Sequence, residues 1–286
     1  MTIDPAFLDE LGRFDAALNR VSTALRQGDQ ESPRIGEGLT FSDYRRYSPG
    51  DDTRLIDWHL YARTEEYFVK QFEEERNLTV HVLLDASASM DYGEGDAHKF
   101  EFGAKLGLGF AYLTAEENND FQFSTFGERH ERLDTGRSNR GELLRIVDLL
   151  NETAPSGEAS FEGALGDYAG TIGSRSLVVV VSDFLSAPDD VEEGLSALAE
   201  NDLVCPHVIA PTERDPAAEG DTIFVEPEAG TERRTYFAGR RANQYRDRLQ
   251  RHVEEVDARC RDLRAEHPVV DTGSDFFEAF LSTWLG

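Results

Sequence analysis

Short apolar segments alternate along this chain with segments of helical periodicity, and this alternation limits the fold more than any other feature of the sequence. The apolar segments are rich in Val, Leu, Ile and Phe, as is typical of strands buried on both faces of a parallel sheet. The predicted strands are 80–84, 121–126, 177–181 and 203–209, and the predicted helices between them are 100–116, 140–150, 161–172 and 191–200. We therefore expect an α/β fold, an open parallel sheet with helices on both faces.

The N-terminal part of the sequence predicts a separate segment before this sheet. Asp4-Pro5 is a favourable helix start, and apolar residues recur after it at spacings of four and three: Phe7, Leu11, Phe14, Leu18, Val21 and Leu25. So short a stripe favours packing on the protein's own core over pairing with a partner helix. A polar connection follows at 27–38. We expect residues 1–76 to hold this helix and a signature segment, and residues 77–286 to hold the sheet domain with a C-terminal helical extension.

Three further elements complete the expected sheet domain. Gly127 gives the chain a place to turn, so residues 129–133 predict an antiparallel edge strand. Residues 238–266 predict a long amphipathic helix, and residues 275–285 predict a short closing helix.

Composition excludes several classes of protein. With 39% hydrophobic residues the chain can bury a core, yet no apolar run is long enough to span a membrane. The N-terminus MTIDPAFLDELGRF carries acids where a signal peptide needs basic residues, so a cytoplasmic location is expected. Cys205 and Cys260 are the only cysteines, too few for a disulfide framework and wrongly spaced for zinc.

The net charge of −27 opposes nucleic-acid binding, because the 56 acidic residues are spread along the whole chain. Lysine is present only at Lys70, Lys99 and Lys105, and arginine supplies the other basic residues. A lysine-poor acidic surface is typical of proteins from a salt-adapted cytosol. We therefore favour a halophilic source as the explanation of the charge over a dedicated acidic binding face.

The stretch HVLLDASASMD places an aspartate and two alternating serines directly after a predicted strand. Asp85, Ser87 and Ser89 offer the hard oxygen ligands that Mg²⁺ or Mn²⁺ prefers, although a plain turn has the same composition. A second strand, LVVVVSD, also ends on an acid, Asp183. Since the carboxyl ends of parallel strands meet at one edge of the sheet, two carboxylates can face one ion, which favours the metal site.

The stretch Asp85-Ala86-Ser87-Ala88-Ser89 resembles the D-x-S-x-S signature of von Willebrand factor A domains and their metal-ion-dependent adhesion site, MIDAS. The resemblance implies a Rossmann-like, von Willebrand factor A-type open sheet in which Ser87 and Ser89 bind the ion directly. It also implies that Asp85 and Asp183 act through bound waters and that a partner's carboxylate completes the shell. The sequence departs from the family where a loop threonine is usual, because GEASFEGAL has Ala159 there, and Ser160 is the substitute within reach.

A second motif precedes the sheet, in LTFSDYRRYSPGDDTRLIDWHLYARTEEYFVKQFEEER. By itself this stretch indicates an ordered network of paired charges and aromatic residues, which more often stabilises a fold than performs chemistry. The stretch resembles the signature of the domain of unknown function 58 family, which precedes a von Willebrand A-like module. The matching residues are Phe41, Arg45, Tyr47, Gly50, Asp51, Asp52, Arg54, Ile56, Asp57, Trp58, Ala62 and Arg63.

The second resemblance implies a partner. Members of this family often accompany MoxR-type AAA+ ATPases, in chaperone-like assembly, maturation or metal insertion. Many members carry apolar membrane anchors, and this chain is similar to the short soluble type. The implied role is a protein-binding adaptor that uses bound Mg²⁺ to hold the ATPase or a client protein.

An enzyme is the alternative class of function. The chain has no phosphate-binding loop, no nucleophile elbow and no zinc-protease motif, so it is not expected to be an enzyme. A metal-dependent phosphoesterase using Asp85, Asp183 and either Asp51 or Asp52 remains the alternative. The seven histidines form no recognisable constellation, and His81 is expected to be a hydrogen-bonded core residue.

Overall fold

The computed structural model describes residues 2–26, 39–46, 67–74, 79–216, 220–225, 232–237 and 239–285. The chain divides into two compact units. One unit combines residues 1–20 with residues 78–286, and the other consists of residues 21–77.

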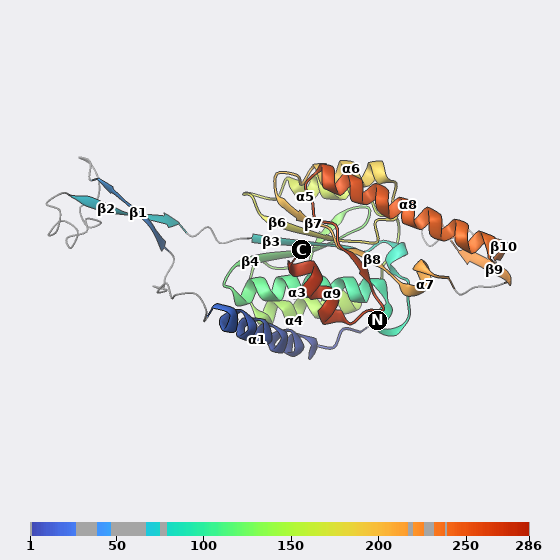
Figure 1. Cartoon of the computed structure of the whole chain (residues 1–286), viewed down its shortest axis with the longest axis horizontal. Coiled ribbons are helices and arrows are strands. Elements are labelled where there is room, and N and C mark those ends of the chain that lie inside the picture. Colours follow the sequence, from blue (N-terminus) through green and yellow to red (C-terminus); the bar gives the residue numbers. More distant parts are fainter. Residues whose placement is uncertain are drawn as a thin grey trace. The chain divides into compact units, whose positions relative to one another are not determined.

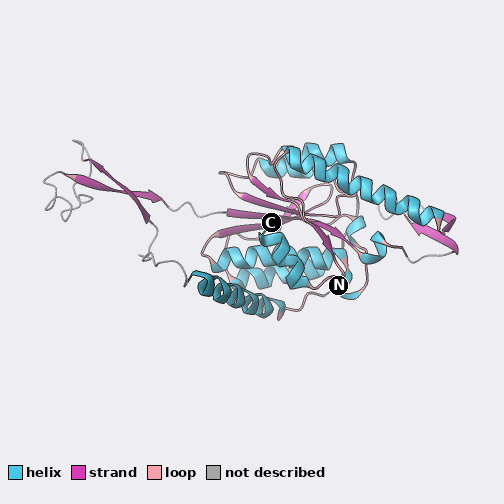
Figure 2. Ribbon diagram, viewed as in Figure 1, coloured by secondary structure: helices cyan, strands magenta, loops and turns pink. Residues whose placement is uncertain are grey.

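The larger unit is built on a five-stranded sheet in the order β5-β4-β3-β6-β7. Its strands are β3 (Thr79–Asp85), β4 (Asp120–Phe126), β5 (His130–Arg132), β6 (Leu177–Val181) and β7 (Asp202–Val204). Strands β4, β3, β6 and β7 are parallel, and β5 returns antiparallel to β4 at the edge (Figure 2). The predicted open sheet and its antiparallel edge strand are therefore confirmed.

One face of this sheet is covered by helices from both ends of the chain. These helices are α3 (Lys99–Glu116), α4 (Arg140–Glu152), α9 (Phe276–Leu285) and the first turns of α1 (Phe7–Arg26), seen below the sheet in Figure 1. Their apolar side chains form one core cluster with alternate residues of the central strands, including Val82, Leu84 and Val181. The N-terminal helix thus packs on the protein's own core, as its short stripe predicts.

Elements from the middle of the chain and α8 (Arg240–Asp262) cover the opposite face (Figure 1). They include the π-helical turn η4 (Phe161–Leu165), α5 (Gly166–Ala169) and α6 (Pro188–Ser196). Their core cluster contains the strand residues that point the other way, among them Leu83 and Val180, together with both cysteines. Cys205 and Cys260 are free and buried.

The predicted strand 203–209 is wrong as a single element. Residues 203–204 belong to β7, whereas β8 (His207–Ile209) pairs in parallel with β11 (Val269–Asp271) in a separate two-stranded ladder. Pro206 lies between β7 and β8, and proline lacks the N–H that a ladder needs. The interruption lets the chain leave the main sheet, although one bridge, Ser182 to His207, still connects the two.

The remaining short elements lie beside the DASAS turn and near the C-terminus. They are η2 (Ala88–Met90), η3 (Gly95–Ala97), α7 (Pro211–Arg214) and the antiparallel hairpin of β9 (Gly220–Val225) and β10 (Glu232–Phe237). The sequence did not predict this hairpin or β11. The predicted helix 161–172 is also too long, because helical structure there ends at Ala169. No helix among the described residues is long and apolar enough to cross a membrane.

The smaller unit contains a hairpin in which β1 (Leu39–Arg46) pairs antiparallel with β2 (Phe68–Glu74). The pairing is irregular between Phe41 and Asp43. Arg45, from the signature motif, lies opposite Val69. The connection 27–38 lies outside the described residues, as do these signature residues: Tyr47, Gly50, Asp51, Asp52, Arg54, Ile56, Asp57, Trp58, Ala62 and Arg63.

The close approach of α3 to the sheet depends on a glycine. A Cβ on Gly107 would lie 2.7 Å from Val82 Cγ1 and 3.0 Å from the ring of Phe123. We expect Gly107→Ala to lower the free energy of unfolding by about 1–3 kcal/mol because it overpacks this contact. Chemical denaturation measures the change. Gly166→Ala is the matched control, since a Cβ on Gly166 in α5 meets nothing within 4 Å; equal stability of the two variants would contradict the close contact.

Candidate functional site

The candidate site lies where the strand order of the main sheet reverses. The neighbours of β3 are β4 on one side and β6 on the other. The connection from β3 to β4 runs through α3 on one face, and that from β6 to β7 runs through α6 on the other (Figure 1). Open α/β sheets bind ligands at such switch points, outside the carboxyl ends of the strands. Asp85 ends β3 here, and Ser182 and Asp183 follow the end of β6.

Asp85 is held in place by hydrogen bonds to both of its carboxylate oxygens. The backbone N–H of Ser87 donates to Oδ1 at 2.8 Å, and the Ser182 hydroxyl donates to Oδ2 at 2.6 Å. The side chain is buried, with 1% of the residue exposed. Burial and the nearby charge of Asp183 raise the pKa of Asp85 to about 7, although its hydrogen bonds act in the opposite direction. Asp85 therefore links β3 to β6 and can exchange a proton near neutral pH.

The two serines of the DASAS turn lie side by side. Their hydroxyl oxygens, Ser87 Oγ and Ser89 Oγ, are 3.1 Å apart, and both residues are buried. The turn is fixed from the far side as well, because the Ala88 N–H donates to the Gly157 carbonyl at 2.9 Å. The structure therefore brings Asp85, Ser87 and Ser89 together at the end of β3.

Asp183 is paired with a lysine that the sequence reasoning did not assign to the site. Lys99, the first residue of α3, donates from Nζ to Asp183 Oδ2 at 2.7 Å and to Glu213 Oε1 in α7 at 2.9 Å. The Leu185 N–H donates to the other oxygen of Asp183 at 3.2 Å. Burial by itself lowers the pKa of Lys99, but Asp183 and Glu213 raise it above its ordinary value, so the ammonium stays charged.

Ser160 has a different role in the structure. Its hydroxyl accepts the Gly163 N–H at 3.2 Å, which makes Ser160 the N-cap of η4. No contact between described residues joins this hydroxyl to Ser87, Ser89 or Asp183. Ala159, at the position where a threonine is usual, packs against the core cluster on the η4 side of the sheet. The assignment of Ser160 as an ion ligand therefore stays a prediction from the sequence.

Histidines gather on the other side of Asp183, where the sequence indicated no constellation. His207 Nδ1 lies 3.1 Å from His267 Nε2, and His252 Nε2–H donates to the Phe184 carbonyl at 2.6 Å. Burial lowers the pKa of His207 well below its ordinary value. These rings come from β8, α8 and the segment before β11, so no local spacing could have announced them. His81, by contrast, is buried and hydrogen-bonded to the Tyr168 hydroxyl at 2.8 Å, as expected.

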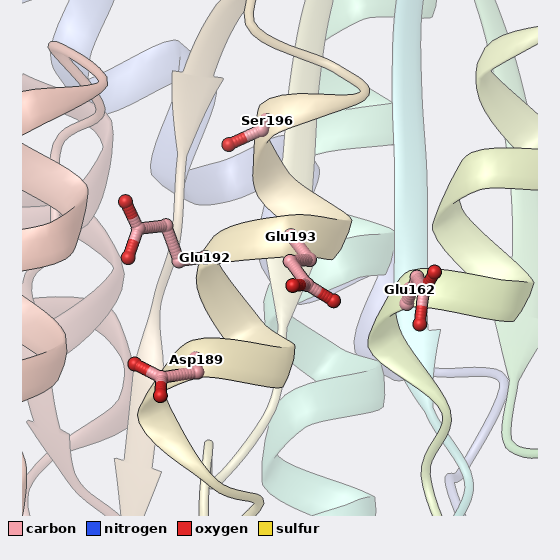
Figure 3. Close-up of a pocket in the computed structure, with 5 residues that line it drawn as sticks. All are labelled: Glu162, Asp189, Glu192, Glu193 and Ser196. Carbon is pink, nitrogen blue, oxygen red and sulfur yellow. The ribbon is translucent and has the colours of Figure 1, made fainter.

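A pocket of about 560 Å³ lies at η4 and α6 (Figure 3). It is lined by Glu162, Asp189, Glu192, Glu193 and Ser196. Arg259 of α8 pairs with two of these acids, Asp189 and Glu192, each at 2.9 Å. The remaining carboxylates belong to the solvated acidic surface that the net charge implies, and no strand-end residue reaches the pocket.

The strand-end residues fit a weakly held divalent ion. In octahedral Mg²⁺ coordination, adjacent oxygens lie about 3 Å apart, which is the separation of the Ser87 and Ser89 hydroxyls. Within the described part of the chain, however, no three acidic, histidine or cysteine residues converge as a metal cluster. An ion would therefore depend on the two hydroxyls and on waters held by Asp85 and Asp183, of which Asp183 is already paired with Lys99.

The raised pKa of Asp85 predicts how stability changes with pH. Between about pH 4 and pH 7 the folded protein keeps a proton on Asp85 that the unfolded chain loses, so stability falls as pH rises. Relative to Asp85→Asn, the wild type should lose up to about 1.4 kcal/mol of unfolding free energy per pH unit between pH 5 and 7. Denaturation at several pH values measures this difference, and parallel curves for the two proteins would contradict a raised pKa.

Lys99 supplies a second prediction. Lys99→Met leaves the carboxylates of Asp183 and Glu213 buried without their cation, so it should lower the free energy of unfolding by about 3–5 kcal/mol. The control is Arg175→Met, because Arg175 pairs with Asp202 on the surface, where the two side chains are 72% and 62% exposed. That change should leave the stability nearly unchanged, because water screens an exposed ion pair. Similar losses in thermal and chemical denaturation for both variants would disprove a special role for the Lys99 pair.

Proteins of similar sequence and structures of similar fold are known. The chain is 25% identical over 240 residues to the uncharacterized protein Rv1480 of Mycobacterium tuberculosis (strain ATCC 25618 / H37Rv), across 80% of this chain and 74% of that protein. Its structure is similar to the conserved hypothetical protein BatB of Bacteroides thetaiotaomicron, with a TM-score of 0.47 at 15% identity, across 73% of this chain and 100% of that one. It is also similar to the SpRpn10 VWA domain, with a TM-score of 0.42 at 12% identity, across 71% of this chain and 93% of that one.

The model of one protein family covers most of the sheet domain and most of the signature segment. It is described as "Protein of unknown function DUF58" and matches residues 43–259. This range contains the strand-end residues Asp85, Ser87, Ser89 and Asp183, the site lysine Lys99, and most of the predicted signature. The chain belongs to the DUF58 family.

Proposed function

We propose that this protein is a protein-binding adaptor whose partner docks at the carboxyl ends of β3 and β6. The observation that carries the proposal is the arrangement at this edge, where two exposed apolar side chains border a buried polar cluster. Tyr92 is 39% exposed and Leu185 is 41% exposed. Protein interfaces commonly combine aromatic and aliphatic anchors with a few polar groups of fixed orientation.

Both apolar residues are positioned by the polar cluster itself. The Lys99 ammonium lies 5.5 Å from the centre of the Tyr92 ring, and the Lys99 N–H donates to the Tyr92 carbonyl at 2.8 Å. Leu185 follows Asp183 by two residues and donates its N–H to that carboxylate. A partner that contacts Tyr92 and Leu185 therefore reaches the groups that hold Asp183.

The polar cluster supplies a place for a conditional Mg²⁺ or Mn²⁺ ion in this proposal. Ser87 and Ser89 would hold the ion directly, and Asp85 and Asp183 would orient its waters. When bound, the ion would supply the positive charge that a carboxylate of the partner requires. Ser160 would bind the ion only if its loop shifted, because its hydroxyl caps η4 in the structure.

The proposed partner is a MoxR-type AAA+ ATPase, as the family resemblance implies, and the protein itself performs no catalysis. The buried carboxylates support a non-catalytic role. Asp183 pairs with an ammonium, and Asp85 is 1% exposed with a hydrogen bond to each carboxylate oxygen, so neither is placed to attack a substrate as arranged. Asp51 and Asp52, which a phosphoesterase would need, lie outside the described residues.

Binding to a purified MoxR-type ATPase from the same cell tests the proposal. Tyr92→Ala and Leu185→Ala should each weaken binding at least about tenfold in a direct titration, since truncating an interface anchor commonly costs about 2 kcal/mol or more. Val269→Ala is the matched control. Val269 is 53% exposed, but it is the first residue of β11 and therefore not at the carboxyl end of a strand, where the partner is proposed to dock. Unchanged binding in all three variants would contradict docking at this edge. Phosphoester turnover that disappears in Asp85→Ala would instead support the enzyme.

A further inference from the structure

Lys99 carries a buried positive charge beside Asp183, one of the acids of the proposed ion site. The ammonium is almost fully buried, with 1% of its side chain exposed, and it lies 2.7 Å from Asp183. It is a lysine in a chain that uses arginine for most of its basic residues. A compact ammonium resembles a metal ion more closely than a guanidinium does, because it is a point charge with three donors.

The Lys99 ammonium and the divalent ion would share the carboxylate of Asp183. Asp183 gives one oxygen to Lys99 and the other to the Leu185 N–H, so an ion or its water must approach a carboxylate that is already engaged. Inside a protein, like charges a few ångströms apart repel strongly, because little water is present to screen them. A divalent ion at Ser87 and Ser89 whose waters used Asp183 would therefore be repelled by Lys99 through this shared carboxylate, while Asp85 and Asp183 attract it.

Lys99 also has alternative partners if it leaves Asp183. The second carboxylate paired with Lys99 belongs to Glu213, whose Oε1 lies 2.9 Å from the ammonium, and the centre of the Tyr92 ring lies 5.5 Å from it. Glu213 is itself fixed at the start of α7, where Oε2 accepts the Ala210 N–H at 3.3 Å. The ammonium can thus give up Asp183 and remain paired, which a lysine with one acidic partner could not do.

We propose that Lys99 is an internal competitor of the divalent ion, so that Mg²⁺ or Mn²⁺ binds at Ser87 and Ser89 only when the ammonium releases Asp183. This inference rests on the ion site of the proposed function and names the residue that regulates it. A partner that contacts Tyr92 reaches the ring beside Lys99, and so acts on the same ammonium. Ion binding and partner binding are then coupled through one salt bridge.

Titration of the purified full chain with Mn²⁺ alone tests this competition. The variant Lys99→Met/Glu213→Gln removes the ammonium together with one of its two acids, so the net charge of the buried cluster is unchanged. We expect it to bind Mn²⁺ at least about tenfold more tightly than the wild type. Lys105→Met should leave the affinity unchanged. Molar KCl in the buffer screens the exposed carboxylates of this acidic protein, which would otherwise bind Mn²⁺ without specificity.

Two further variants locate the ion and separate the possible causes. Adding Ser87→Ala and Ser89→Ala to the double variant should remove the gain in affinity. Glu213→Gln alone keeps the ammonium on Asp183 and should bind Mn²⁺ no more tightly than the wild type. Equal Mn²⁺ affinity of the wild type and the double variant, or no binding by either, would overturn the competition. The Mn²⁺ titration contains no partner protein, so a failure of the competition would not contradict the adaptor proposal. Conversely, a double variant that binds Mn²⁺ tightly in a protein that binds no partner would contradict only the adaptor proposal.

Discussion

The carboxyl edge of the sheet depends on the pairing of buried charges. Asp85, Asp183 and Glu213 place carboxyl groups near one another in a region from which water is largely excluded, and the Lys99 ammonium is the cation that pairs with two of them. Burying an unpaired charge costs several kcal/mol, so these positions are interdependent. The same contacts tie the start of α3 to the end of β6 and to α7. The two salt bridges of Lys99 therefore also hold these separate elements together.

The position of this cluster follows from the way the sheet is wound. Apolar residues of the central strands alternate between two core clusters, one beneath α3, α4 and α9 and one beneath η4, α6 and α8 (Figure 1). Both faces are thus covered by helices, and the strand ends at the switch point are where polar side chains can gather. Tyr92 and Leu185 lie in the loops that leave those ends, and both are exposed beside an otherwise enclosed set of charges.

Differences between the predicted and observed elements have local physical causes. Pro206 ends β7 and separates it from β8, an effect that a run of apolar residues hides. Ser160, one residue after the aligned ligand position at Ala159, is engaged by the fold itself, because the first N–H groups of η4 need an acceptor and its hydroxyl satisfies one of them. Lys99 and the rings of His207, His252 and His267 were missed because their partners are far away in the sequence. No spacing rule joins residue 99 to residues 183 and 213.

The sequence by itself determined the class of fold, the strands that form its centre, and the presence of Asp85, Ser87, Ser89 and Asp183 at strand ends. These features depend on periodicity and on short motifs, which are local properties of the chain. Only the tertiary structure decided which charges meet. It paired Asp183 with an ammonium from α3, linked Asp85 to Ser182, and left the Ser87 and Ser89 hydroxyls adjacent. Electrostatic energy in a protein interior depends on distances across elements, and those distances are fixed only when the helices pack on the sheet.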